Sequence, residues 1–105
     1  MKSVELPKSA VTIGDCAFAS LGKIETITIP SKVKEIEGRA FAGSRNLKKI
    51  VIESKKITAI GRNAFDLLKN TDIYVPKKKY SEYKKLIRNS FTNKNCFKKI
   101  RIIKY

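Results

Sequence analysis

The fold is decided by residues 27–41, which read ITIPSKVKEIEGRAF. The pattern recurs about every 23 residues, because residues 4–18 read VELPKSAVTIGDCAF and residues 50–65 read IVIESKKITAIGRNAF. Each copy opens with apolar residues at alternate positions and ends with Ala-Phe. A fixed period of this length is typical of repeat proteins, in which each unit buries its apolar face only against its neighbours. The sequence therefore predicts a solenoid of stacked repeats.

The start of each copy predicts a short β-strand. Two columns of apolar residues recur at this point: Val4, Ile27, Ile50 and Ile73 in one, and Leu6, Ile29, Ile52 and Val75 in the other. Alternation places one face of each strand inward. Strands in the same register stack as a parallel sheet, and the rest of each repeat supplies the crossover that such strands need. The later spacing from Val33 to Ile36 fits either a second short strand or a tight turn.

Two further features recur after the strand. Gly14, Gly38 and Gly61 are expected to adopt backbone angles that other residues resist. The phenylalanine that ends each copy is expected to join one stacked column in the core. A short helical turn is expected next, with Leu21 and Leu68 as further core contacts.

The last third of the chain departs from the repeat. Residues 78–90 predict an amphipathic helix, since Tyr80, Tyr83, Ile87 and nearby apolar residues follow helical spacing. Residues 97–105 are expected to form a last strand beside residues 73–75, with the apolar spacing of the earlier strands. This helix and strand would close the open end of the stack, which terminal repeats must do.

These patterns divide a single domain, residues 1–105, into repeats of about 1–23, 24–46 and 47–70 and a closing unit at 71–105. No equivalent closing segment precedes the first repeat. The chain is therefore expected to be the C-terminal part of a longer array. The alternative is a monomer that associates weakly with another copy through its first repeat.

The composition disfavours catalysis. Histidine is absent, which removes the commonest general base and metal ligand. The acids Asp15, Glu35 and Glu37 stand without a partner base, and no phosphate-binding glycine loop is present. Cys16 and Cys96 are far apart and are expected to be free thiols. We therefore predict a non-enzymatic protein with no cofactor or metal site, and no run of apolar residues is long enough to span a membrane.

The positive charge is distributed unevenly. Residues 1–46 hold seven lysines and arginines against five acids, whereas residues 47–105 hold seventeen against four. Nearly all of the formal net charge of +15 therefore lies in the second half.

The string Ile-x-Ile-Pro-x-x-Val-x-x-Ile-x-x-x-Ala-Phe resembles the BspA-type (Treponema pallidum-type) leucine-rich repeat. Residues 27–41 carry it almost entire, residues 6–18 carry it with Ala10 in the valine place, and residues 50–65 carry it with one extra residue and no proline. Residues 73–76, followed by Tyr83, resemble the closing segment of such proteins.

The resemblance implies a right-handed coil of strands with a concave parallel sheet and no shared catalytic residues. Many members are secreted or surface-attached, and adhesion to host proteins or other cells is proposed for several. An extracellular or cell-surface location is thus implied, although residues 1–7 do not read as a signal peptide. The high positive charge is not implied by the repeat.

Two functional interpretations follow, and the first is a protein–protein interaction module. Side chains between the buried columns should face outward on the sheet and meet a protein partner or cell-surface component. These candidates are Thr26, Thr28, Lys49, Val51, Asp72, Tyr74, Lys99 and Arg101. Tyr74 is the aromatic anchor of the kind that interfaces favour.

The alternative is binding of a polyanion, either a glycan or a nucleic acid. Basic residues gather around the predicted closing helix: Lys77, Lys78, Lys79, Lys84, Lys85 and Arg88. Tyrosines lie between them, which suits stacking on bases. Clustered lysines also keep a repeat protein in solution, so the charge by itself does not decide between the two interpretations.

Overall fold

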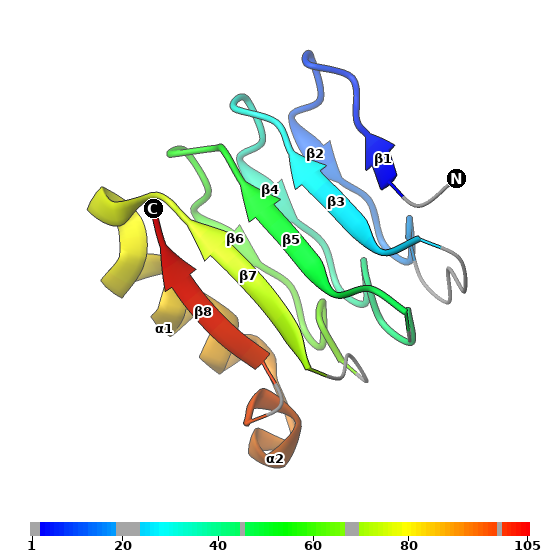
Figure 1. Cartoon of the computed structure of the whole chain (residues 1–105), viewed down its shortest axis with the longest axis vertical. Coiled ribbons are helices and arrows are strands. Elements are labelled where there is room, and N and C mark those ends of the chain that lie inside the picture. The colour runs from blue at the N-terminus through cyan, green and yellow to red at the C-terminus, as the bar shows by residue number, and fades with distance from the viewer. Residues whose placement is uncertain (1–2, 19–23, 45, 67–69, 99) are drawn as a thin grey trace.

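The computed structural model describes residues 3–18, 24–44, 46–66, 70–98 and 100–105, and its architecture is an α/β repeat fold (Figure 1). The larger sheet is parallel, in the order β1 Ser3–Glu5, β3 Thr26–Ile29, β5 Lys49–Ile52, β7 Thr71–Val75 and β8 Ile100–Lys104. A smaller parallel sheet contains β2 Thr12–Ile13, β4 Glu35–Ile36 and β6 Ala59–Ile60. The second apolar segment of each repeat is therefore a short strand.

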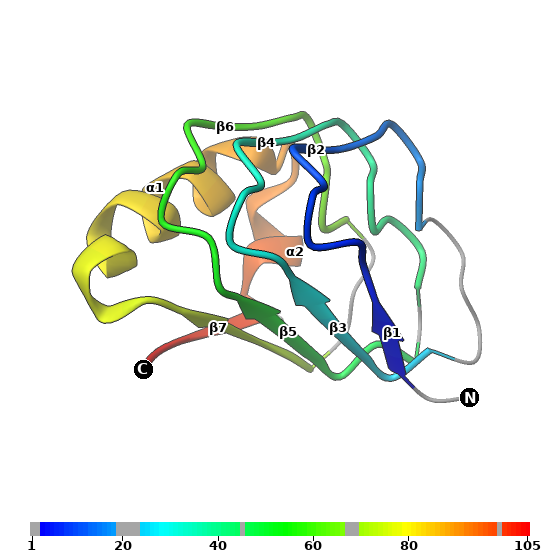
Figure 2. The same cartoon turned by 90° about the horizontal axis from the view of Figure 1, so that it is seen from above.

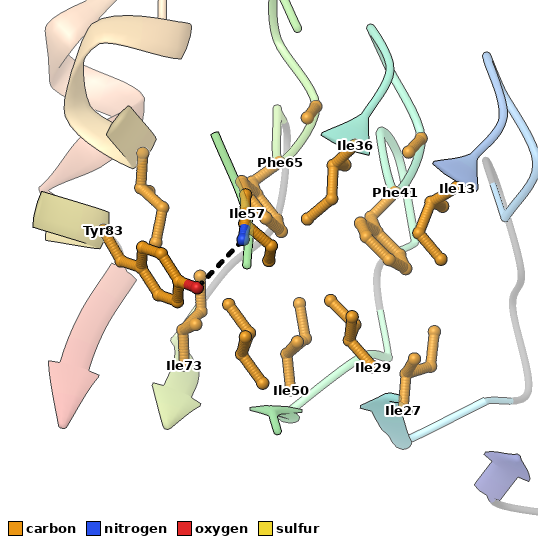
Figure 3. Packing of buried hydrophobic residues seen from close by; sticks show 14 of the residues in the cluster. Ile13, Ile27, Ile29, Ile36, Phe41, Ile50, Ile57, Phe65, Ile73 and Tyr83 are labelled. Carbon is orange, nitrogen blue, oxygen red and sulfur yellow. Dashed lines mark hydrogen bonds between the residues drawn. The ribbon is translucent and has the colours of Figure 1, made fainter. Parts of the chain in front are cut away.

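The two sheets lie on opposite sides of one core (Figure 2). The register of the larger sheet confirms the predicted columns, because Ile27 pairs with Val4 on one side and with Ile50 on the other, and Ile50 pairs with Ile73. Equivalent side chains consequently stack from repeat to repeat, and those of Ile27, Ile50 and Ile73 are fully buried (Figure 3).

The phenylalanines form the predicted stacked column. The ring centroid of Phe41 lies 5.7 Å from that of Phe18 and 5.5 Å from that of Phe65, with the ring planes nearly parallel. Among the described residues, hydrogen-bonded turns without a helix follow these phenylalanines. Leu21 and Leu68 lie outside the described residues.

The prediction that Gly14, Gly38 and Gly61 adopt unusual backbone angles was wrong, because none of the three has a positive φ. Among the described residues a positive φ is found instead at Cys16, Arg39, Asn63 and Asn70, with 57°, 58°, 55° and 52°, and at Gly43, with 75°. Gly61 is needed for space, because a Cβ there would lie 2.3 Å from the backbone nitrogen of Gly38. Close approach of consecutive repeats, rather than a positive φ, therefore explains this glycine.

The closing unit contains a 3₁₀ turn η1 Lys77–Lys79, helix α1 Tyr80–Ser90, a short helix α2 Lys94–Phe97 and strand β8. The helix and last strand are as predicted, but Phe97 was wrongly placed in the strand. It ends α2 and packs against Phe91 with ring centroids 5.8 Å apart. The strand therefore begins only at Ile100, which pairs with Thr71, two residues from the predicted register.

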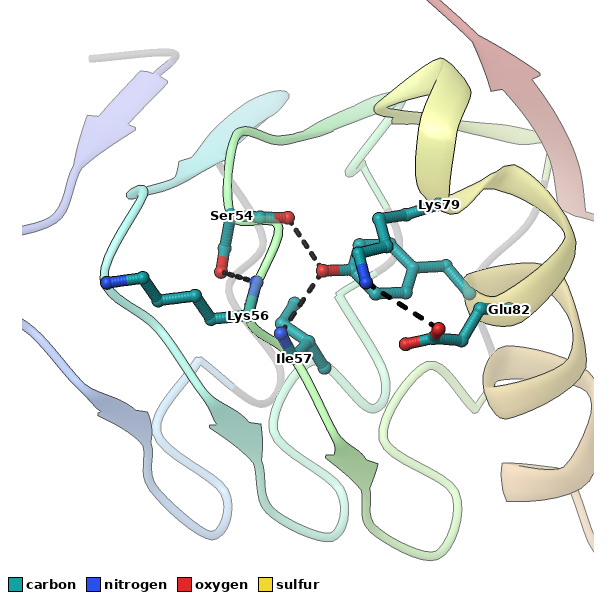
Figure 4. Close-up of polar contacts among 6 residues, drawn as sticks. Ser54, Lys56, Ile57, Lys79 and Glu82 are labelled. Carbon is teal, nitrogen blue, oxygen red and sulfur yellow. Dashed lines mark hydrogen bonds and ion pairs between the residues drawn. The ribbon is translucent and has the colours of Figure 1, made fainter.

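The third repeat contains one extra residue before Ile57, and the structure accommodates it with buried polar groups. The hydroxyl of Ser54 donates to the Val33 carbonyl and accepts from the Lys56 N–H. The Tyr83 hydroxyl of α1 donates to the Ser54 carbonyl at 2.8 Å and accepts from the Ile57 N–H at 3.1 Å (Figure 4). The closing helix thus satisfies backbone groups of the repeat that it covers.

Burial declines toward the first repeat. Leu6, Ala10, Phe18 and Ile24 are only half-buried, whereas their equivalents one repeat later are fully buried: Ile29, Val33, Phe41 and Leu47. Each inner repeat is covered on both sides, and in the described chain the first repeat is covered by the second alone.

Candidate functional site

The outward face of the larger sheet presents two rows of side chains in register. One row crosses the strands β3, β5, β7 and β8 as Thr26, Lys49, Asp72 and Arg101. The second row runs beside it as Thr28, Val51, Tyr74 and Ile103. All four side chains of the second row are half-buried, so this row is a flat, mainly apolar stripe within a polar surface.

Two contacts order the outward face. The ammonium of Lys49 lies 5.0 Å from the ring centroid of Tyr74, a cation–π distance. The guanidinium of Arg101 binds the carboxylate of Asp72 through two hydrogen bonds of 3.0 and 2.9 Å. These bonds raise the pKa of Arg101 above its ordinary value. Both contacts hold long side chains in defined positions beside the stripe.

The structure thus brings seven of the eight predicted partner-binding residues onto one face. Lys99 lies outside the described residues. The two-residue difference in the register of β8 gives Arg101 the place beside Asp72, and it leaves the faces unchanged because side chains alternate with a period of two. Ile103 joins the stripe beside Tyr74 for the same reason.

A shallow hollow of about 220 Å³ adjoins the stripe at Thr28. It is also lined by Leu6, Lys8, Pro30 and Glu53, which follow the ends of the first three strands. The sequence reasoning named Thr28 but missed the hollow, since Lys8, Pro30 and Glu53 lie beyond the strand ends and come from three different repeats.

The predicted polyanion-binding residues lie on η1 and α1 but are not equivalent. Lys77, Lys78 and Lys85 are exposed, as is Arg88. The ammonium of Lys79 lies 3.7 Å from a carboxylate oxygen of Glu82 (Figure 4). Its positive charge is therefore partly compensated within the same helical segment.

Lys84 belongs to a different cluster. Its ammonium lies 5.6 Å from the ring centroid of Tyr80, and the ammonium of Lys104 lies 5.3 Å from the same centroid. A hollow of about 290 Å³ is found here between α1, α2 and β8, and its lining is Tyr80, Lys84, Phe97, Lys98, Ile100, Arg101 and Ile102. The sequence reasoning missed Lys104 as a site residue, because this lysine of β8 meets Tyr80 of α1 only in three dimensions.

Two other kinds of site were searched for in the described residues. No group of three or more histidine, cysteine, aspartate or glutamate side chains there is arranged to hold a metal ion. No helix within the described ranges has both the length and the apolar character required to cross a membrane. The distinctive surfaces of this part of the chain are therefore the sheet face and the basic closing unit.

Comparison with known proteins supports the assignment made from the repeat. No curated protein and no solved structure matches the chain significantly. Residues 1–104 match the family described as "BspA type Leucine rich repeat region (6 copies)". This match covers nearly the whole chain and coincides with the repeats that stack in the structure. The chain belongs to the BspA-type leucine-rich repeat family.

Proposed function

We propose that this chain is a protein-binding module whose partner docks on the outward face of the five-stranded sheet. The observation that carries the proposal is the in-register stripe of Thr28, Val51, Tyr74 and Ile103. Tyrosine is enriched among the residues that dominate binding energy. Here its ring is already held by Lys49, so little side-chain freedom is lost on binding.

The repeat architecture fits such a role. We infer a right-handed solenoid, because parallel strands joined by a crossover within one sheet are right-handed in about 98% of cases. We also infer that residues 1–105 act as one unit, an inference supported by a cluster of buried residues that, in the described part of the chain, joins the repeats to the closing helix. Family membership favours protein interaction in general terms. Adhesion at a cell surface is the specific form that the resemblance implies.

A selection experiment tests the sheet face without a known partner. A displayed library of small protein domains is panned on the wild-type chain, and each recovered clone is measured against two double variants. One combines Val51→Asp with Tyr74→Ala on the sheet face. The control combines Thr12→Asp with Thr58→Ala, two exposed positions on and beside the smaller sheet. Most clones should lose at least tenfold in affinity for the first variant only, and equal behaviour toward both would reject the proposal.

Polyanion binding is a second candidate, favoured by the exposed lysines Lys77 and Lys78 on η1 and Lys85 on α1. Contacts to phosphates or sulfates release counterions, so the affinity should fall steeply with salt. The test is retention on heparin and binding of short DNA over a salt series, with a triple variant in which Lys77, Lys78 and Lys79 become serine. If these lysines form a binding site, the variant should bind more weakly, and its affinity should depend less steeply on salt concentration. Early elution of both the wild-type protein and the variant from heparin would reject polyanion binding.

A further inference from the structure

Strand β8 is the outer strand of the larger sheet, and its far edge carries unpaired backbone groups. Tyr105 donates its N–H to the Val75 carbonyl at 3.0 Å and accepts the Lys77 N–H at 2.9 Å. In a parallel ladder the residues that bond to one neighbour alternate along the strand. The backbone groups of Ile100, Ile102 and Lys104 therefore point away from β7, where no described segment pairs with them.

This edge is long enough to accept another strand. β8 has five residues, three of them isoleucine, while β1 at the opposite edge has three residues. Sheet edges of this kind are templates for pairing with a further chain. A peptide that pairs here gains main-chain hydrogen bonds, and its alternate side chains reach pockets on either side.

The hollow of about 290 Å³ lies beside the same strand. Its apolar lining is supplied by the rings of Tyr80 and Phe97 and by Ile102. The volume is just below the range of about 300–1,000 Å³ for small-molecule sites, so it suits one or two inserted side chains better than an intact cofactor.

Three lysines place positive charge around the hollow. Lys84 and Lys104 both hold ammonium groups near the Tyr80 ring, and Lys98 lies in the lining. None of these three lysines forms an ion pair with a carboxylate of the described residues. A carboxylate brought to this ring would be attracted by both ammonium groups.

We propose that β8 binds an extended acidic peptide segment of a partner protein, which adds to the larger sheet as a sixth strand. Apolar side chains of the segment enter the hollow against Tyr80, Phe97 and Ile102. Its carboxylates meet Lys84, Lys98 and Lys104. This site shares strand β8 with the sheet face of the proposed function, but it uses the outer edge of the strand and the hollow beside α1, so either can exist without the other.

The geometry favours a peptide over a polyanion. A sulfated glycan or a nucleic acid backbone offers no row of N–H and C=O groups at strand spacing, and it has no aliphatic side chain for a hollow lined by Phe97 and Ile102. The hollow and its lysines lie on the same side of the sheet, since Lys84, Lys98 and Lys104 surround the hollow or the Tyr80 ring that lines it. A peptide with both apolar and acidic side chains on one face of its strand therefore satisfies the backbone edge, the hollow and the lysines together.

The probe is a fluorescein-labelled peptide of about seven residues, long enough to cover the five residues of β8. Threonine occupies every second position, and glutamate and leucine occupy the positions between, so that the glutamates and leucines share one face of the strand. Binding to the full chain is followed by fluorescence anisotropy. Two further peptides carry N-methyl groups, one on every threonine amide and the other on every glutamate and leucine amide. Only one of these two sets faces β8, so one methylated peptide should bind at least tenfold more weakly and the other should bind like the parent.

Protein variants test the same contacts from the other side. Lys104→Pro removes an outward N–H without removing a bond to β7, and Lys104→Ala removes the same charge alone. Proline should weaken binding at least fivefold relative to alanine. The double variant Lys84→Ser with Lys98→Ser should weaken binding more than Lys77→Ser with Lys78→Ser, although both lose two charges. If the proline variant does not fold, the methylated peptides carry the test.

Several results overturn the proposal. Equal binding of the two methylated peptides would exclude strand addition. Equal losses of peptide affinity in the two double lysine variants would show that the peptide responds only to net charge. Full displacement of the peptide by a heparin fragment that binds through Lys77 and Lys78 would lead to the same conclusion. Tyr74→Ala should leave peptide binding unchanged, and this variant separates failure of the edge site from failure of the sheet face.

Discussion

Replacing Tyr83 by phenylalanine tests how the closing helix stabilises the repeats. The side chain is fully buried, and its hydroxyl joins two backbone groups of the third repeat. Phenylalanine keeps the ring and its packing but removes both hydrogen bonds. The Ser54 carbonyl and the Ile57 N–H are then left buried without their partner (Figures 3 and 4).

The expected loss follows from these two groups. Each buried polar group left unsatisfied costs roughly 1–3 kcal/mol, so the two groups exposed by Tyr83→Phe should together lower the free energy of unfolding by roughly 2–6 kcal/mol. This is a large share of the total stability of a small domain, about 5–15 kcal/mol. The measurement is urea unfolding followed by circular dichroism, with a lower midpoint and an unchanged slope.

Tyr80→Phe provides the matched control. It removes a hydroxyl from the same helix, but Tyr80 is half-buried and its hydroxyl forms no hydrogen bond with the described residues. Its loss should remain within about 0.5 kcal/mol. If Tyr83→Phe were no more destabilising than this control, the hydroxyl would not be the group that joins the helix to the third repeat, and the reasoning would be refuted.

Three further predictions concern the core and its titration. Gly61→Ala should lower the free energy of unfolding by more than about 2 kcal/mol in urea, because its Cβ would meet backbone atoms at 2.3–2.8 Å. Gly14→Ala should be close to neutral, because its Cβ would meet nothing nearer than 3.9 Å. Phe41→Ala should cost about 3–5 kcal/mol by the same measurement, since it removes the middle ring of the stacked column. Burial raises the pKa of Tyr83 above its ordinary value of 10.0, so its stabilisation is complete below about pH 10 and is lost as the pH rises through the folded pKa. The alkaline decline in unfolding free energy should be shallower in Tyr83→Phe, and an unchanged decline would contradict this assignment.

The parts of the fold that repeat were predictable from the sequence. A fixed period places Ile27, Ile50 and Ile73 in one column, and the ladder pairs them as expected. The phenylalanine column follows from the same argument. Periodicity is sufficient here because each repeat contacts only its neighbours, so the local pattern specifies the packing.

The register of β8 was not predictable from that pattern. A strand shifted by two residues keeps every side chain on the same face, so the apolar spacing of Ile100 and Ile102 fits both registers equally. The structure selects the register in which Arg101 lies beside Asp72. The hollow near Tyr80 was missed for a related reason, because α1, α2 and β8 do not repeat and meet only in three dimensions.

The extra residue in the third repeat shows how the two kinds of information combine. In the first two repeats the equivalent N–H groups, those of Ala10 and Val33, bond to the carbonyls of Pro7 and Pro30 in the same turn. In the third repeat, with its extra residue, the N–H of Ile57 bonds to the Tyr83 hydroxyl instead. Such groups must find partners when they are buried. No fourth regular repeat covers them, and Tyr83 of the closing helix supplies a hydroxyl that can both donate and accept. The third repeat and the closing helix therefore form one structural unit. A change in the length of the third repeat should be tolerated only together with a change at Tyr83.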